Sequence, residues 1–202
     1  ILWASALGGG VNKVVKRKVA FRHDILSAGT AGNGIITALY EDESSMVWVG
    51  ARSDILLLWD KKTGKQYSYK ELEVLKDISR EGNAVQAIIK HRRTGSIWLG
   101  TRYDGVYVVE CDQAKPVALM RLREEYPSLR NINALSQDTV GRVWIATEQG
   151  LFIGNTVNSR KFLVQPVEIL NDTINHECVQ TVLCDKKGIW IGTKNYGAFH
   201  LS

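Results

Sequence analysis

The chain has 202 residues, of which 45% are hydrophobic and 23% charged, and a formal net charge of +5 at pH 7. This length allows one substantial hydrophobic core, and the composition excludes a low-complexity or disordered chain. The longest purely apolar run covers residues 55–59, far short of the ~20 residues of a membrane-spanning helix. The charge is compatible with acidic partners, but the absence of a long basic block argues against nucleic-acid binding.

A short phrase built around tryptophan recurs along the chain. In its clearest copy Ile97 and Leu99 flank Trp98, and the small residue Gly100 follows. The copies are spaced by roughly 45–50 residues, which is the length of a four-stranded β-propeller blade. The tryptophans of the five copies are Trp3, Trp48, Trp98, Trp144 and Trp190.

The phrase also indicates how its strand is packed. Side chains alternate between the two faces of a strand, so Trp98 and Gly100 share one face while Ile97 and Leu99 share the other. Both faces are apolar, so neither is expected to face water. We therefore predict sheets that stack face to face, with the small residue leaving room for its neighbour.

The predicted strands follow one another in the same order in each repeat. Residues 71–78 fit either one helical turn or an irregular strand, and both alternatives stay open. The strands are expected at 2–5, 11–15 and 19–26; at 35–40, 46–50, 55–59 and 66–69; at 84–90, 96–100, 106–110 and 117–122; at 132–136, 142–146, 151–154 and 162–170; and at 179–184, 188–192 and 198–201.

This order predicts an all-β fold, a β-propeller of four-stranded antiparallel blades in a single domain over residues 1–202. The first repeat lacks an inner strand and the last lacks an outer one, and the chain starts inside a strand without a signal peptide. We therefore expect an arc of about four and a half blades of a larger propeller within a longer protein. The blades are assigned to residues 1–28 (partial), 29–80, 81–128, 129–174 and 175–202 (partial).

The two ends of such an arc are expected to expose apolar surface, because repeats of this kind bury their faces only against neighbours. The chain alone is then expected to associate, or to be less stable than a complete propeller. The residues expected to be under-covered are Leu2, Val11 and Val14 at one end and Ile189, Ile191 and Phe199 at the other.

The inner strand, its turn and the Trp strand together match a known repeat. Residues 132–151 and 179–197 both run from an aliphatic strand through Asp138 or Asp185 into the Trp phrase. This pattern resembles the two-component regulator propeller repeat, and the resemblance covers nearly the whole chain. The departures are His91 at the aspartate position, Asp54 at a turn glycine and Ala146 at the glycine of Gly-Thr.

Two features of the repeat have a direct physical reading. The aspartate before the Trp strand can accept hydrogen bonds from its own turn amides. Gly95, Gly141 and Gly188 can supply a positive φ in that turn. Both features are interpreted as structural.

The resemblance implies a sensor. Such repeats build the periplasmic input region of membrane-anchored hybrid sensor histidine kinases, which act through a phosphorelay in polysaccharide-degrading bacteria. It implies carbohydrate sensing on the periplasmic side of the inner membrane, with the kinase in other domains. The partners it implies are an oligosaccharide, the remaining blades of the parent sensor, and a second copy of the parent in a homodimer. The net positive charge favours an anionic oligosaccharide.

The ligand-binding candidates lie where loops are expected to gather at one end of the blades. Guanidinium groups, amides and aromatic rings suit sugar hydroxyls, carboxylates and sulfates. Polar residues at one register of the inner strands are expected to face the axial channel, where water can satisfy them; these include Thr37. The ligand-binding candidates are Arg52, Arg102, Tyr103, Lys194, Tyr196, Asn83, Asn131, Gln86, Asn133 and Gln180.

Enzyme signals are weak in this sequence. No histidine pair has metal-ligand spacing, and no nucleophile elbow, phosphate-binding loop or dinucleotide fingerprint is present. We expect no catalytic residue, no metal and no cofactor in this segment. The three cysteines are expected to be free, mostly buried thiols, because Cys178 and Cys184 are ~20 Å apart on an extended strand. The alternative to a sensor is a protein-interaction scaffold propeller without a small ligand.

Overall fold

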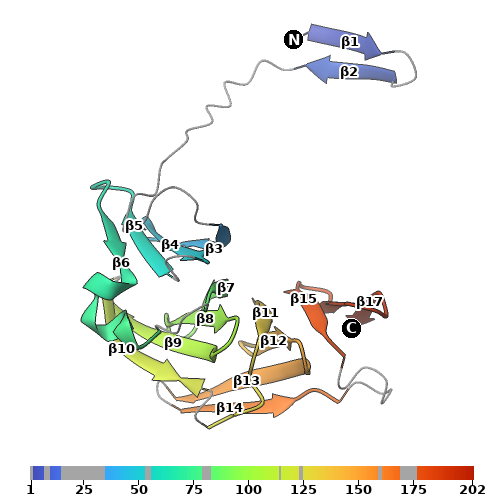
Figure 1. The fold of residues 1–202 in the computed structure, drawn as a ribbon. Helices are drawn as coiled ribbons and strands as arrows, with labels where there is room; N and C mark the ends of the chain where they lie inside the picture. Colours follow the sequence, from blue (N-terminus) through green and yellow to red (C-terminus); the bar gives the residue numbers. More distant parts are fainter. Residues whose placement is uncertain are drawn as a thin grey trace.

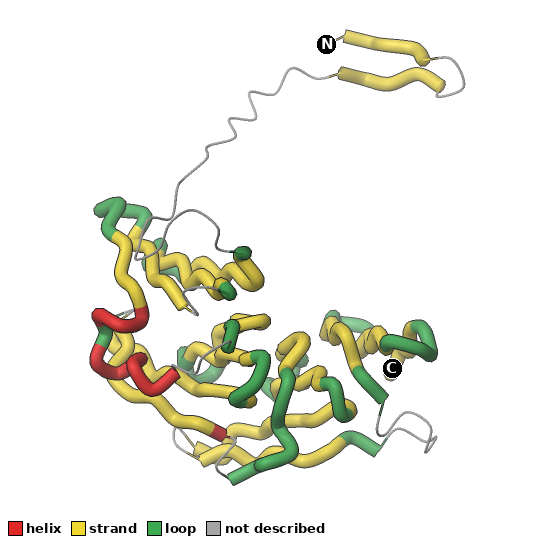
Figure 2. Tube along the Cα trace, in the orientation of Figure 1, coloured by secondary structure: helices red, strands yellow, loops and turns green. Residues whose placement is uncertain are grey.

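The computed structural model describes residues 2–6, 10–14, 35–52, 56–78, 83–113, 115–122, 125–158, 161–168 and 177–202, with only the backbone in the first two ranges. Nearly all of the described secondary structure is strand (Figures 1 and 2). The first half contains β1 (Leu2–Ala6), β2 (Gly10–Val14), β3 (Ile36–Glu41), β4 (Met46–Ala51), β5 (Leu56–Asp60), β6 (Gln66–Ser68), β7 (Val85–Lys90), β8 (Ile97–Thr101) and β9 (Gly105–Asp112). The second half contains β10 (Lys115–Arg121), β11 (Ile132–Gln137), β12 (Val143–Thr147), β13 (Gly150–Asn158), β14 (Lys161–Pro166), β15 (Val179–Cys184), β16 (Ile189–Thr193) and β17 (Ala198–Leu201).

The strands form antiparallel sheets in chain order, as the repeat predicts. Strands β3–β6, β7–β10 and β11–β14 make three four-stranded sheets, β15–β17 make a three-stranded sheet, and β1 pairs with β2. The inner strands β3, β7, β11 and β15 contact one another in sequence. Figure 1 shows these four sheets following one another round an arc, which confirms the β-propeller fold.

Two predictions for the irregular parts of the chain have different outcomes. Residues 71–78 are helical, in the short 3₁₀ helices η1 (Tyr69–Glu71) and η2 (Glu73–Ile78), where Leu75 and Ile78 are buried against the first interface. The strand expected at 19–26 lies outside the described residues. Within the described part of the chain no helix is long and apolar enough to cross a membrane.

Three of the tryptophans, Trp48, Trp98 and Trp144, point at the sheet that follows them in the chain. Trp48 packs in one buried cluster with Ile88 and Leu99 of the second sheet. Trp98 lies with residues of the third sheet, and Trp144 with Val182 of the fourth. The aliphatic residues that flank Trp98, Trp144 and Trp190 face the preceding sheet, so one interface is repeated three times.

This orientation corrects the expectation for the last sheet. Ile189 and Ile191 are buried against the third sheet and Phe199 is partly buried, whereas Trp190 is exposed. The prediction chose the wrong face of β16, because alternation alone does not say which apolar face has a neighbour. At the N-terminal end, the side chains of Leu2, Val11 and Val14 lie outside the described part of the chain.

Gly50 and Gly100, the small residues two positions after Trp48 and Trp98, pack against the first residue of the next inner strand. A Cβ built on Gly50 would lie 2.4 Å from the carbonyl oxygen of Val85, and one on Gly100 would lie 2.5 Å from Cγ2 of Ile132. At those distances something must move, so the close approach of the sheets depends on the missing side chain. In the fourth copy, that of Trp144, Ala146 is buried at this position.

The turn aspartates have the role that the sequence predicts. Oδ1 of Asp42 accepts the amides of Ser44 and Met46, and Oδ1 of Asp185 accepts those of Lys187 and Gly188. Asp138 does the same, and its Oδ2 also accepts the indole N–H of Trp144 at 3.0 Å. These bonds and the Arg142 guanidinium hold the pKa of Asp138 below its usual value despite the opposing effect of burial.

The threonine that ends the phrase closes the next turn. The hydroxyl groups of Thr101, Thr147 and Thr193 donate to the carbonyl oxygens of three turn glycines at 2.9–3.0 Å. Each also accepts a turn amide at 3.0 Å. The phrase therefore encodes the strand, the interface and the following turn together.

His91, which replaces the aspartate in the second full repeat, is buried and neutral. Its Nε2–H donates to the carbonyl oxygen of Gly141 at 2.9 Å, and its Nδ1 accepts the Thr94 amide at 3.2 Å. Burial lowers the pKa of His91, the charge of Arg93 acts in the same direction, and the bond to Gly141 opposes both. The imidazole also stacks on Trp98, with ring centroids 6.1 Å apart.

We predict that Gly50→Ala destabilises the protein by about 1–3 kcal/mol, because the added methyl group overpacks the interface between the first two sheets. Urea unfolding at low protein concentration measures the effect. The matched control is Gly192→Ala, where a Cβ would lie 2.7 Å from Cγ2 of Thr181, an exposed side chain of the same sheet that can rotate away. An equal loss in both variants would contradict the interface described above.

The buried His91 predicts a loss of stability between neutral pH and pH 5. The unfolded histidine takes up a proton near its ordinary pKa of ~6.5, while the folded one resists protonation, so stability falls as the pH falls. As the pH falls, the free energy of unfolding should decrease less in His91→Gln than in wild type. His200→Gln, which changes an exposed side chain, should show the same decrease as wild type. Parallel pH curves for wild type and His91→Gln would contradict the assignment.

Candidate functional site

The loops that follow the Trp strands lie at one end of the sheets, as predicted. In each blade the amide of the first loop residue donates to the carbonyl oxygen just before the inner strand, at 2.9–3.2 Å. These bonds fix the loop beside the entry to the inner strand. The pairs are Arg52 with Ile35, Arg102 with Ala84, Glu148 with Asn131, and Lys194 with Cys178.

Five of the predicted binding residues are exposed on this loop end, where ligand binding stays a prediction. The guanidinium of Arg102 lies over the ring of Tyr103, 5.2 Å from its centroid. Tyr196 is exposed on the turn that Thr193 closes, and Arg52 and Lys194 are exposed as well.

The two asparagines expected beside them have structural contacts. Asn83 is buried: its Oδ1 accepts the amides of Ala84 and Tyr103, and its Nδ2 donates to Asp104. Asn131 has a positive φ of 50° and donates to Glu148 at 2.6 Å. The side-chain amide of Asn83 thus holds the loop in place. The sequence alone did not show this structural role.

The polar residues of the inner strands occupy equivalent positions, and these positions are β-bulges. The ladder register shifts at Thr37, Gln86, Asn133 and Gln180 in the four sheets. A bulge turns its residue out of the regular ladder. Thr37 and Asn133 then donate to the carbonyl oxygens of Val85 and Val179 on the next inner strand, at 2.6 and 2.8 Å.

For Thr37 and Asn133 these bonds correct the expectation that water in the axial channel satisfies the polar residues of the inner strands. Thr37 and Asn133 bond to the neighbouring sheet instead, because the bulge places their side chains within reach of its backbone. Gln86 is half-buried, and the amide of Gln180 lies 3.1 Å from Sγ of Cys178. Thr37 and Asn133 therefore help to tie consecutive sheets together.

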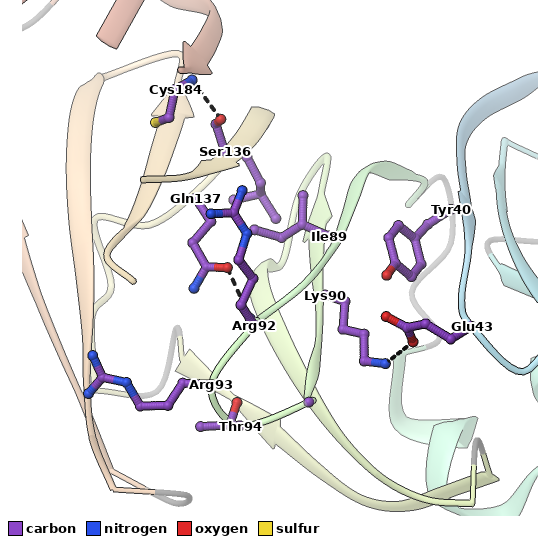
Figure 3. A pocket seen from close by; sticks show the side chains of 12 residues that line it. Tyr40, Glu43, Ile89, Lys90, Arg92, Arg93, Thr94, Ser136, Gln137 and Cys184 are labelled. Atoms are coloured by element: carbon purple, nitrogen blue, oxygen red, sulfur yellow. Dashed lines mark hydrogen bonds and ion pairs between the residues drawn. The ribbon is translucent and has the colours of Figure 1, made fainter. Parts of the chain in front are cut away.

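A pocket of about 850 Å³ lies at the opposite end of the inner strands (Figure 3). Its lining comes from the last residues of all four inner strands and from the turn after β7. The sequence analysis named no ligand-binding candidate at this end of the strands, because the lining residues are dispersed over four repeats. The lining includes Tyr40, Ile89, Lys90, Arg92, Ser136 and Cys184.

The pocket has a basic character. Lys90 forms an ion pair with Glu43, and this bond raises the pKa of Lys90. Arg93 donates to the carbonyl oxygen of Val140 at 3.2 Å. Figure 3 shows the Arg92 side chain beside Ile89 with its guanidinium directed toward Ser136. The described residues provide no hydrogen bond or ion pair to the Arg92 guanidinium, whose backbone amide is held by Gln137 at 3.0 Å.

The remaining groups of the pocket are neutral. Burial raises the pKa of the Tyr40 phenol and that of the Cys184 thiol. Cys111, in a smaller neighbouring pocket of about 550 Å³, has its pKa raised by burial to about 11. All three cysteines are free and partly buried. Among the described residues no group of three or more His, Cys, Asp and Glu side chains is placed to hold a metal ion.

No protein-family model and no curated protein matches the chain. Among solved structures it is similar to the extracellular domain of the putative hybrid two component system BT3049 from B. thetaiotaomicron, with a TM-score of 0.62 and 20% identity over 99% of this chain and 27% of that one. It is also similar to the extracellular domain of the putative one component system BT4673 from the same organism, with a TM-score of 0.60 and 18% identity over 83% of this chain and 21% of that one.

A third similar structure is the computationally designed Ika4 protein, with a TM-score of 0.56 and 16% identity over 86% of this chain and 94% of that one. The chain thus spans only about a quarter of the two extracellular domains. Likeness at these identities concerns the fold. The chain is a β-propeller segment with the fold found in these extracellular domains of signalling systems.

Proposed function

We propose that the chain is a ligand-sensing propeller segment in the extracytoplasmic region of a hybrid two-component sensor. The fold likeness to two extracellular domains of signalling systems supports this proposal. The kinase that would complete the phosphorelay belongs to other domains of the parent protein. The segment itself contributes recognition and no catalysis.

The ligand we propose is an oligosaccharide that carries a carboxylate or sulfate group. The observation that carries this choice is the guanidinium of Arg92, which faces a pocket of about 850 Å³ without an anionic partner among the described residues. Such a volume suits a small ligand. An arginine fork binds carboxylates and sulfates through two parallel hydrogen bonds.

The other lining groups fit such a ligand. Tyr40 and Ser136 offer hydroxyl groups, which can bond to sugar hydroxyls. Ile89 and Leu135 supply apolar surface against which the face of a sugar ring can pack. The exposed loop end with Arg102 and Tyr103 is the competing location for the same ligand.

Calorimetry with an oligosaccharide of uronic acids, and with its neutral counterpart, tests both the ligand class and the location. In the pocket, Arg92→Ala should weaken binding of the acidic sugar by roughly 10- to 100-fold, because a charge-assisted hydrogen bond contributes ~1.5–3 kcal/mol. The backbone amide that holds this turn is unchanged in the variant, so the fold should persist.

Arg102→Ala, which removes an exposed arginine of the loop end, is the matched control and should bind like wild type. Loss of binding in Arg102→Ala with retention in Arg92→Ala would move the site to the loop end. Absence of heat with acidic and neutral sugars alike would reject the glycan and favour the scaffold alternative.

A further inference from the structure

Two pockets meet at a single ion pair. The pocket of about 850 Å³ that contains Arg92 and the smaller one of about 550 Å³ share Glu43, Lys90 and Gly95 in their linings. Lys90 ends β7 in the second sheet, and its ammonium group donates to the carboxylate of Glu43 in the turn between β3 and β4 of the first sheet. Figure 3 shows this pair with the Tyr40 ring beside it. The Lys90–Glu43 ion pair therefore stands between the two pockets.

The charge of Lys90 acts on a group in each pocket. In the larger pocket, burial and the charge of Glu43 raise the pKa of the Tyr40 phenol, and the charge of Lys90 opposes this rise. In the smaller pocket, burial raises the pKa of the Cys111 thiol to about 11, and the charge of Lys90 again opposes the rise. An anionic group entering from either side would be attracted by the same ammonium group.

The ion pair can open without disturbing the sheets that it joins. The side chain of Glu43 is 77% exposed and that of Lys90 is 29% exposed. An exposed ion pair of this kind contributes little to stability. The first two sheets are also held together by the bond from the Thr37 hydroxyl to the carbonyl oxygen of Val85 and by the buried cluster around Trp48.

The larger pocket thus contains two cations in different states. The guanidinium of Arg92 has no anionic partner among the described residues, whereas Lys90 is occupied by a carboxylate of the protein itself. A carboxylate or sulfate of a ligand can make the same charge-assisted hydrogen bond to an ammonium group.

We propose that the Lys90–Glu43 ion pair is a gate, which opens when a second acidic group of the oligosaccharide takes the place of Glu43 on Lys90. Opening joins the two pockets into one groove. This inference rests on the proposed function and narrows its ligand to an oligosaccharide with at least two acidic groups, one on Arg92 and one on Lys90.

The smaller pocket suits a neutral part of the same ligand. Asp42 lines it, and its Oδ1 already accepts two turn amides. A carboxylate at this place can accept a sugar hydroxyl but repels a further acidic group. The side-chain amide of Gln113 offers both a donor and acceptors, and Ile97 adds apolar surface.

Calorimetry of the full chain with a disaccharide of two uronic acids, and with its monomethyl ester, tests the gate. Glu43→Gln should bind the diacid roughly 3- to 10-fold more tightly than wild type does. The reason is that the variant removes both the competitor for Lys90 and the repulsion between two carboxylates. The gain should be nearly absent with the monoester, whose single carboxylate lies on Arg92.

Two further variants assign the two acidic groups. Lys90→Met keeps the aliphatic stem but removes the charge, so it should bind the diacid no more tightly than the monoester. Arg92→Ala should weaken the binding of both sugars. Circular dichroism verifies folding, and if Lys90→Met does not fold, the comparison of Glu43→Gln with its control decides alone.

The matched control is Glu41→Gln, which makes the same change of charge in the same hairpin. Glu41 pairs with Lys61, and neither residue belongs to the lining of either pocket. This variant should bind the diacid like wild type. An equal gain in Glu41→Gln would reduce the effect to net charge and overturn the gate.

The gate and the proposed function can fail separately. If wild type binds the diacid through Arg92, but Glu43→Gln binds it no more tightly, the gate is wrong and the proposed function stands. If neither wild type nor Glu43→Gln binds either sugar, the proposed function is rejected and the gate with it.

Discussion

The fold depends on one repeated packing contact between consecutive sheets. In it the first residue of an inner strand packs against the tryptophan and the small residue of the preceding sheet. Gly100 against Ile132 shows the geometry, because a Cβ on the glycine would overlap the isoleucine. Trp98 meanwhile lies buried against the third sheet. An antiparallel sheet that is apolar on both faces must be covered on both, and here the neighbouring sheets provide the cover.

The strand pattern and the turns could be predicted from the sequence because their causes are local. Alternation around Trp98, the turn aspartates and the glycine spacing all act within one repeat. Asp138 and Thr147 bond within their own hairpins. The resemblance of the repeats therefore led to the β-propeller fold that the structure confirms.

The direction of the tryptophans could not be predicted, because both faces of the strand are apolar and only the neighbouring sheet distinguishes them. This is why Ile189 was expected to be exposed and Trp190 was not. The burial of Asn83 was missed for a related reason: its partner Asp104 lies 21 residues away in the next loop. The pocket around Arg92 was missed because it combines strand ends from four repeats, a combination that exists only after the sheets have stacked.

The two ends of the inner strands differ in chemistry. At the loop end exposed arginine, lysine and tyrosine side chains surround asparagines that hold the backbone. At the other end lies a pocket of basic character, where the guanidinium of Arg92 has no anionic partner among the described residues. The four inner strands lie side by side, so the loop end and the pocket end are each formed by several sheets. A ligand bound at one of these two ends would therefore contact several sheets at once.

Hydroxyl-radical footprinting of the individual tryptophans measures the central contact most directly. In dilute protein Trp48, Trp98 and Trp144 should be protected while Trp190 reacts, because only the first three have a following sheet in the described structure. Protection of Trp190 at the level of the other three in dilute monomer, or rapid oxidation of Trp98, would contradict the repeated interface.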